Sequence, residues 1–203
     1  VTIYCISYLP YEWASPEGFG IRGILDNQEY MFNYHGFLVS DPHPYASQWQ
    51  TWPFSIRPVF FFLATGSAAG EIALIWCMGN PILWWSGVAA FLYIAGKRAS
   101  EKHFELRGIG FLLLCAICQL APNLLITREM FLYHYFTLVP FFCIGIVYVL
   151  KYVSENYRHG TKAVIAYLAV VCLIFALFYP VITGIPISYE HGKSLRWLST
   201  WPI

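Results

Sequence analysis

Four long apolar runs follow one another from Pro81 onward, and they constrain the fold more than any other feature of the sequence. Each has close to the ~20 apolar residues that a helix needs to cross a bilayer. Only 11% of the residues are charged, whereas a soluble domain carries roughly 25%. We therefore predict an all-α membrane protein whose transmembrane domain, residues 81–183, holds four complete transmembrane helices: Pro81–Gly96, Gly108–Ile126, Phe131–Leu150 and Ala163–Thr183.

The residues before Pro81 divide into two parts. Val1–Leu9 is apolar, but nine residues at ~1.5 Å each cannot cross a ~30 Å hydrocarbon core. We interpret it as the end of a fifth, truncated transmembrane helix that Pro10 stops. Residues 10–80 are polar and rich in aromatic residues, Pro and Gly, which predicts a large irregular outer loop. Residues 184–203 are expected to form an outer C-terminal tail.

One segment of the outer loop, Val59–Met78, has two interpretations. It is apolar enough for a single span, but Thr65–Gly70 and Glu71 interrupt it. A carboxylate in mid-membrane would cost about 2.5 kcal/mol or more. We prefer a short β-hairpin with strands over Val59–Leu63 and Ile72–Cys77 around the Gly-rich turn.

Charge indicates how the chain is oriented. Seven of the 12 Lys and Arg residues lie in two short linkers, 97–107 and 151–162. The positive-inside rule places both linkers in the cytoplasm and residues 10–80 outside. All eight Trp residues then lie on the outer side. They indicate either an interfacial aromatic belt or an outer face that binds something flat, such as a sugar ring.

The strongest candidate for binding chemistry lies between the second and third runs. Arg128 occupies a short outer turn, and His134 follows about one helical turn deeper, flanked by Tyr133 and Tyr135. A guanidinium suits bidentate contact with a lipid phosphate, and imidazole and hydroxyl groups add hydrogen bonds. The alternative is that Arg128 snorkels or pairs with Glu129 while His134 only packs.

The sequence gives little evidence for a metal site, a nucleic-acid interface or a catalytic acid–base pair. The histidines lack the spacing of metal ligands, so neither a metal nor a cofactor is expected. A net charge of +1 does not indicate a nucleic-acid partner. The outer carboxylates form no close pair with an evident general acid or base role, so the residues alone name no catalytic group.

Several short motifs occur in an order that resembles the C-terminal membrane region of the protein O-mannosyltransferases. They begin near residue 25 and extend to the end of the chain. They are Tyr34-His35, His43-Pro-Tyr45 with Ser47 and Trp49, Trp52-Pro53, Arg57-Pro58, Gly79-Asn-Pro81, Trp84-Trp85, Arg128 with Phe131-Leu-Tyr-His-Tyr135 and Pro140, Tyr179-Pro180, Gly184 and Leu195-Arg-Trp-Leu198.

The resemblance implies a glycosyltransferase-C fold and an inverting transfer of mannose from a polyprenyl-phosphate carrier to Ser or Thr hydroxyls of a polypeptide, on the non-cytoplasmic face. Arg128 and His134, supported by Tyr133 and Tyr135, are our candidates for binding the carrier phosphate. Candidates for the sugar or acceptor site are His43, Tyr45 and Trp49.

Two departures from the family pattern matter. The acidic catalytic motif of the family lies in its first outer loop, so the general base is expected upstream and this fragment alone is expected to be inactive. Eukaryotic members carry a β-trefoil domain between the seventh and eighth spans, for which Pro10–Asn80 has no room. We therefore expect a bacterial plasma-membrane enzyme.

Two other functions stay open. A related lipid-linked glycosyltransferase would modify a glycolipid instead of a protein. A non-catalytic membrane subunit or scaffold would use its aromatic outer face to bind a partner. The upstream reading frame separates the last alternative from an enzyme, because an enzyme requires further spans and an acidic outer loop.

Overall fold

A computed structural model describes residues 2–16, 18–37, 43–65, 70–100, 107–126 and 128–202. The chain divides by its internal contacts into two units, Val1–Asp41 with Leu125–Arg128, and Pro42–Leu124 with Glu129–Ile203. The positions of these units relative to one another are not determined.

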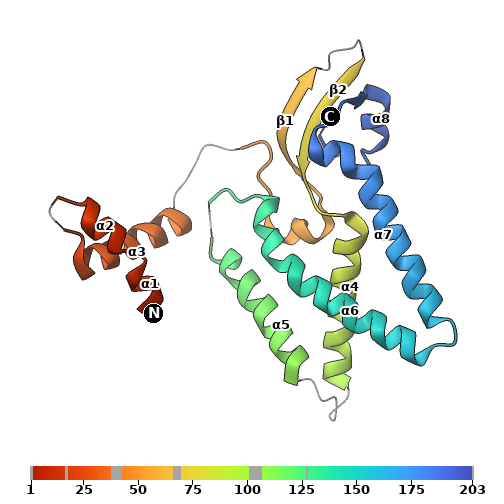
Figure 1. The fold of residues 1–203 in the computed structure, drawn as a ribbon, viewed down its shortest axis with the longest axis horizontal. Coiled ribbons are helices and arrows are strands. Elements are labelled where there is room, and N and C mark those ends of the chain that lie inside the picture. The colour runs from red at the N-terminus through yellow and green to blue at the C-terminus, as the bar shows by residue number, and fades with distance from the viewer. Residues whose placement is uncertain are drawn as a thin grey trace. The chain divides into compact units, whose positions relative to one another are not determined.

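Three helices form the framework of the larger unit (Figure 1): α4 (Pro81–Ser100), α6 (Val139–Asn156) and α7 (Gly160–Thr183). Small residues let α4 and α6 approach closely. A Cβ atom on Gly87 would lie 2.8 Å from the Cβ of Phe142, and one on Gly145 would lie 2.8 Å from the ring of Phe91. The sequence places glycine where each aromatic ring needs space, as is usual for helices that pack in a membrane.

The helices follow the predicted apolar runs with shifted ends. Two of them, Leu132–Asn156 and Gly160–Thr183, are long and apolar enough to cross a membrane. The second run forms α5 (Arg107–Leu120) and a 3-10 turn, η2 (Ala121–Leu124), with a shorter apolar helical stretch over Gly110–Leu124. Among the described residues, helix length and hydropathy thus support two transmembrane helices. They do not confirm the predicted count of four.

The third run forms two helical elements instead of one. Residues Leu132–Leu138 form a 3-10 helix, η3, and Pro140 lies in the first turn of α6. Proline lacks an N–H and has a fixed φ, which suits the first turn of a helix. Pro180, in contrast, does lie inside α7.

A small sheet makes the fold mostly helical instead of all-α. Strands β1 (Val59–Thr65) and β2 (Glu71–Cys77) pair antiparallel, with a bulge between Phe60 and Phe62. This confirms the predicted hairpin, so the alternative of a single span is wrong. A third strand that we did not predict, β3 (Ile187–Ser188), pairs with the start of β2 and gives the order β1-β2-β3.

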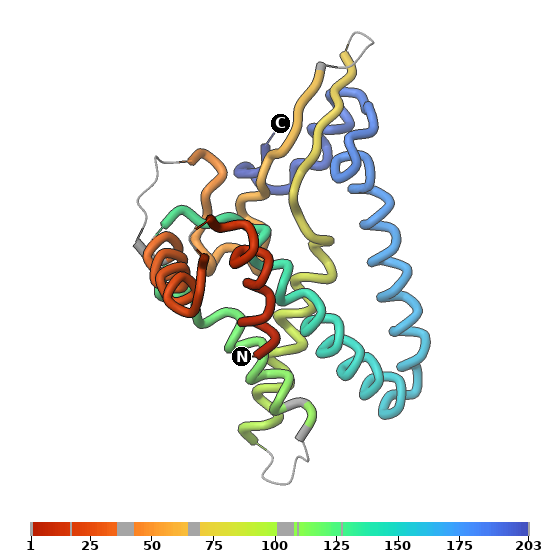
Figure 2. The backbone as a smooth tube through the Cα atoms, turned by 60° about the vertical axis from the view of Figure 1, so that its left-hand side comes forward, coloured from red at the N-terminus to blue at the C-terminus, as the bar shows by residue number. Residues whose placement is uncertain are grey.

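The C-terminal tail returns to the hairpin, as Figures 1 and 2 both show. A short helix, α8 (Tyr189–Ser194), follows β3. Beyond it, the ring of Trp201 lies 5.9 Å from that of Trp76 in β2 and 5.7 Å from that of Phe178 in α7. Gly184 ends α7 with a φ of +76° and lies against Ile75. The tail therefore joins α7 to one side of the sheet.

The smaller unit also differs from the prediction. It holds α1 (Thr2–Ile6), α2 (Leu9–Ala14) and an 18-residue helix, α3 (Gly20–Phe37), so residues 10–80 are not irregular throughout. Pro10 does not stop a helix but lies in the first turn of α2. The carboxylate of Glu12 accepts hydrogen bonds from the backbone N–H groups of Gly20 at 2.5 Å and Phe19 at 2.7 Å, which lower its pKa and cap α3.

Candidate functional site

The loop that contains η1 (Trp49–Phe54) is hydrogen-bonded to the segment that precedes η3. The backbone N–H of Ser47 donates to the carbonyl of Met130 at 2.8 Å. The Trp52 indole is 0% exposed, and its Nε1 donates to the Ser47 hydroxyl at 2.9 Å. These contacts bring residues 43–58 beside residues 130–135, although the two stretches are far apart in the sequence.

His134 lies where the two stretches meet. Its imidazole stacks on Trp52, with ring centroids 5.9 Å apart and an interplanar angle of 12°. It also stacks on Tyr133, with ring centroids 4.6 Å apart. The Nδ1 atom is 2.9 Å from the carbonyl oxygen of Phe131 and 3.4 Å from the N–H of the same residue. The shorter distance favours the tautomer in which Nδ1–H donates to the carbonyl, a bond that fixes the ring orientation.

The two tyrosines that flank His134 face different surroundings. Tyr133 is 40% exposed and stacks on Phe131 at 5.4 Å. Tyr135 is only 1% exposed, and its ring packs 5.0 Å from Trp84 of α4 and 5.4 Å from Phe142 of α6. Tyr133 can meet a ligand at the surface, whereas Tyr135 holds η3 against the helices.

His43 and Tyr45 extend the same surface. The His43 ring meets the edge of Phe131 at 5.0 Å, and its Nδ1 accepts a hydrogen bond from the backbone N–H of Tyr45 at 3.2 Å. Tyr45 in turn packs 5.9 Å from Phe60 of β1. We call the surface formed by His43, Tyr45, Phe131, Tyr133 and His134 the aromatic shelf. Trp49, the third residue predicted for the sugar or acceptor site, begins η1 and is half-buried.

Arg128 belongs to a different unit from the aromatic shelf. It groups with the smaller unit, while His134 belongs to the larger one. The side chain is half-buried, and among the described residues its Nε has no hydrogen-bond partner. The structure therefore brings together His43, Tyr45, Tyr133, His134 and Tyr135, and it does not place Arg128 relative to them.

Sequence reasoning missed the residues that hold the aromatic shelf in place. Trp52 and Phe131 were noted in motifs but not assigned to the site. Ser55 ends η1 in the left-handed region, with a φ of 51°, and its carbonyl accepts a hydrogen bond from Trp201 Nε1 at 2.7 Å. A non-glycine residue with positive φ gives no clear signal in a single sequence, and the Trp201 contact links residues 146 positions apart.

The arrangement offers ring faces and two imidazoles, which suit contact with a ring-shaped and anionic ligand. Within the described ranges, no group of three His, Cys, Asp or Glu side chains is placed to hold a metal ion.

Comparisons with known proteins agree in pointing to one family. A model of the C-terminal four TMM region of protein-O-mannosyltransferase matches residues 21–201. Dolichyl-phosphate-mannose–protein mannosyltransferase 1 of Saccharomyces cerevisiae is 30% identical over 221 residues, 97% of this chain and 25% of the yeast protein. Polyprenol-phosphate-mannose–protein mannosyltransferase of Mycobacterium tuberculosis is 31% identical over 198 residues, 89% of this chain and 37% of that protein.

A solved structure agrees with the sequence relatives. A chain of the S. cerevisiae protein O-mannosyltransferase Pmt1–Pmt2 complex bound to the sugar donor matches with a TM-score of 0.68 and 27% identity, over 91% of this chain and 27% of that one. The chain thus spans a quarter to just over a third of the length of these relatives. Because the family model matches most of the sequence, this integral membrane protein belongs to the protein O-mannosyltransferases, within their C-terminal four-transmembrane region.

Proposed function

We propose that this chain is the C-terminal membrane part of a polyprenyl-phosphate-mannose-dependent protein O-mannosyltransferase. The enzyme would transfer mannose to Ser and Thr hydroxyls of a polypeptide on the non-cytoplasmic face. The names of the yeast and mycobacterial relatives support the donor and the reaction. The observation in the structure that carries the proposal is His134, which Trp52, Tyr133 and the Phe131 carbonyl hold in one orientation.

We assign carrier-phosphate binding to Arg128 and His134, with Tyr133 at the surface and Tyr135 as the buried support of η3. The phosphate is the leaving group, so donors fixed around it stabilise the charge that develops during transfer. A guanidinium and an imidazolium are suitable donors because charge-assisted bonds to phosphate are stronger than neutral ones. With Nδ1–H bonded to the Phe131 carbonyl, His134 would donate to the phosphate through Nε2–H in its protonated form. The general base would come from a part of the enzyme outside this chain.

We assign His43, Tyr45 and Trp49 to the sugar or acceptor side of the site. The ring contact of His43 with Phe131 at 5.0 Å supports this, because it places His43 beside the residue whose carbonyl orients His134. A mannosyl group attached to the phosphate at His134 would then extend toward His43 and Tyr45, whose rings offer flat apolar surfaces.

Four spans are part of the same proposal: α4, α5 with η2, η3 with α6, and α7. We place residues 1–9 at the end of a preceding span, residues 10–80 and 184–203 outside, and the linkers 97–107 and 151–162 in the cytoplasm. Cysteine substitution in a cysteine-free full-length enzyme tests this. A membrane-impermeant maleimide added to intact cells should label a cysteine introduced at Glu190 and should not label one introduced at Asn156.

We propose that the enzyme resides in a bacterial plasma membrane, and only the mycobacterial relatives support this location. The alignment with the yeast protein covers 221 residues against 203 in this chain, so the yeast relative has no large insertion in the aligned segment either. The short Pro10–Asn80 segment therefore does not distinguish bacterial from yeast members.

Transfer assays on the full-length enzyme test the phosphate site. A hydrogen bond to a charged group contributes about 1.5–3 kcal/mol, so His134→Ala and Arg128→Ala should each lower kcat/KM by roughly 10- to 150-fold. His159→Ala changes an exposed histidine of the inner linker and should leave kcat/KM unchanged. Comparing a Ser/Thr peptide with a lipid acceptor separates protein from glycolipid transfer. Near-normal kcat/KM and carrier affinity in both site variants would refute the assignment.

A further inference from the structure

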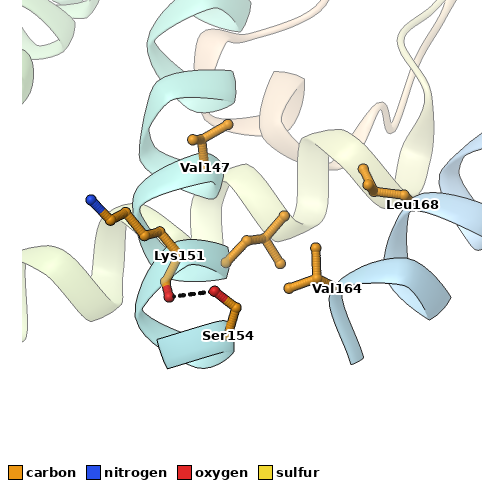
Figure 3. A pocket seen from close by; sticks show the side chains of 6 residues that line it. Val147, Lys151, Ser154, Val164 and Leu168 are labelled. Atoms are coloured by element: carbon orange, nitrogen blue, oxygen red, sulfur yellow. Dashed lines mark hydrogen bonds between the residues drawn. The ribbon is translucent and has the colours of Figure 1, made fainter. Parts of the chain in front are cut away.

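The helices α6 and α7 enclose a hollow near the turn that joins them (Figure 3). The two helices meet very closely at the turn, where a Cβ on Gly160 would lie 2.0 Å from the carbonyl oxygen of Val153. They then diverge (Figure 1), which opens the space between them. The hollow measures about 320 Å³, and its lining residues come from both helices: Val147, Leu150, Lys151, Ser154, Val164 and Leu168.

The lining of this hollow, which we call the α6–α7 groove, is almost entirely apolar. The Ser154 hydroxyl donates to the Lys151 carbonyl of its own helix at 2.9 Å and is thereby satisfied. Ordered water needs two to four polar partners, so water is a poor occupant. Val147 is 63% exposed and Leu168 is 51% exposed, so the groove opens onto the outward face of the two membrane-length helices. An exposed apolar face on helices of membrane length is suited to contact with a lipid acyl chain.

Three cations lie at or near the turn end of the α6–α7 groove: Lys151, Arg158 and Lys162. The amine of Lys151 points away from α7 in Figure 3 and lies 3.9 Å from the Glu155 carboxylate, a weak exposed pair. Arg158 and Lys162 are exposed at the turn, and for neither is an ion pair found within the described residues 151–162. Lys162 precedes Leu168 by six residues, or about 9 Å along α7. Positive charge therefore lies at the turn end of the α6–α7 groove, and its apolar lining extends away from the turn along the two helices.

From this combination we propose that the α6–α7 groove binds one anionic phospholipid. One acyl chain lies along Val147, Val164 and Leu168, and the head-group phosphate meets Arg158 and Lys162. The first turn of α7 carries no acidic residue that would repel the phosphate. Basic residues beside membrane helices attract anionic lipids by about 1 kcal/mol each, whereas a zwitterionic lipid gains little from them. The site lies on the linker side, apart from the aromatic shelf, and does not depend on the proposed mannosyl transfer.

Native mass spectrometry of the purified full-length enzyme tests the site, with phosphatidylglycerol and phosphatidylcholine as probes. We expect retention of phosphatidylglycerol over phosphatidylcholine. Arg158→Gln with Lys162→Gln should weaken phosphatidylglycerol binding by about 25-fold, roughly five-fold per cation. The double variant Arg22→Gln with Lys193→Gln removes two exposed cations elsewhere and should bind like the wild type.

A second pair of variants tests the groove itself. Leu168→Trp fills it and should abolish retention of the lipid. Leu173→Trp makes the same change on α7 at a 67% exposed position outside the lining and should not affect retention. Three results would overturn the proposal: equal retention of both lipids by the wild type, wild-type binding by Leu168→Trp, or competition by inorganic phosphate as effective as by phosphatidylglycerol. Because lipid retention is measured without transfer, a failure here is distinct from a failure of the proposed enzyme activity.

Discussion

Gly79 precedes α4 and allows Trp84 to fold back against the chain. A Cβ on Gly79 would lie 1.9 Å from Cε2 and 2.0 Å from Nε1 of the Trp84 indole. Trp84 is buried, and its ring packs on Tyr135, the residue after His134. In Gly79→Ala, the distance from the new Cβ to the Trp84 indole must grow from 1.9 Å to an ordinary contact of 3.4 Å. Either the indole or the backbone must therefore shift by about 1.5 Å, and the indole is what packs on Tyr135 of η3.

The size of the effect follows from this overlap. Forcing extra volume into a packed core costs about 1–3 kcal/mol. In thermal unfolding of the full-length enzyme at a fixed scan rate, Gly79→Ala should lower Tm by roughly one to three degrees, because the shift per kcal/mol falls as chain length rises. Gly96→Ala is the matched control, because a Cβ at Gly96, inside α4, would meet nothing within 4 Å. Alanine favours a helix over glycine, so the Tm of this control should stay the same or rise slightly.

A double-mutant cycle identifies the contact responsible. Trp84→Leu removes the indole atoms that the new methyl group would meet. Adding Gly79→Ala to Trp84→Leu should therefore cost less than Gly79→Ala costs in the wild type, with a coupling energy within the usual 0.5–3 kcal/mol. Equal Tm values for Gly79→Ala and Gly96→Ala, or zero coupling in the cycle, would refute the reasoning.

Two further predictions concern titratable groups outside the proposed spans. The hydrogen bonds from Gly20 and Phe19 lower the pKa of Glu12, so its stabilising effect is present above the ordinary carboxyl pKa and is lost as pH falls through the lowered value. Hydrogen exchange at the start of α3 should therefore show protection at pH 7 that falls only below about pH 4.3, and Glu12→Ala should remove it at pH 7. Burial raises the pKa of the Cys77 thiol to about 11, so this thiol is neutral at pH 8. In a variant that retains Cys77 alone, maleimide should label it only after unfolding; rapid labelling of the folded protein would contradict this.

The elements that could be predicted are those that local sequence determines. The long apolar runs specified helices, and the Gly-rich turn between two apolar segments specified the β1–β2 hairpin. The helix α3 was missed because its residues are mixed in polarity and lack a long apolar run. Strand β3 was missed because two residues carry no periodicity and form a strand only by pairing with Glu71 and Ile72.

The candidate site was only partly predictable for the same physical reason. His134 and its tyrosine neighbours are adjacent in sequence, so they could be grouped in advance. The contacts that complete the aromatic shelf join distant residues: His43 meets Phe131, and Ser47 bonds to Met130. A single sequence contains no signal for such pairs, because each partner is compatible with many others until the backbone brings them together.

Two long-range hydrogen bonds of the larger unit share one chemical feature, which helps short and widely spaced motifs to specify this fold. Asn80 Nδ2 donates to the carbonyl of Val171 at 2.9 Å, and Trp201 Nε1 donates to the carbonyl of Ser55 at 2.7 Å. In both cases a particular side chain is the donor, while the acceptor is a backbone carbonyl that every residue has. The donor position therefore tolerates few substitutions and the acceptor position tolerates many. Asn80 accordingly lies in the motif Gly79-Asn-Pro81, whereas Val171, at the other end of the same bond, lies in an ordinary apolar stretch of α7.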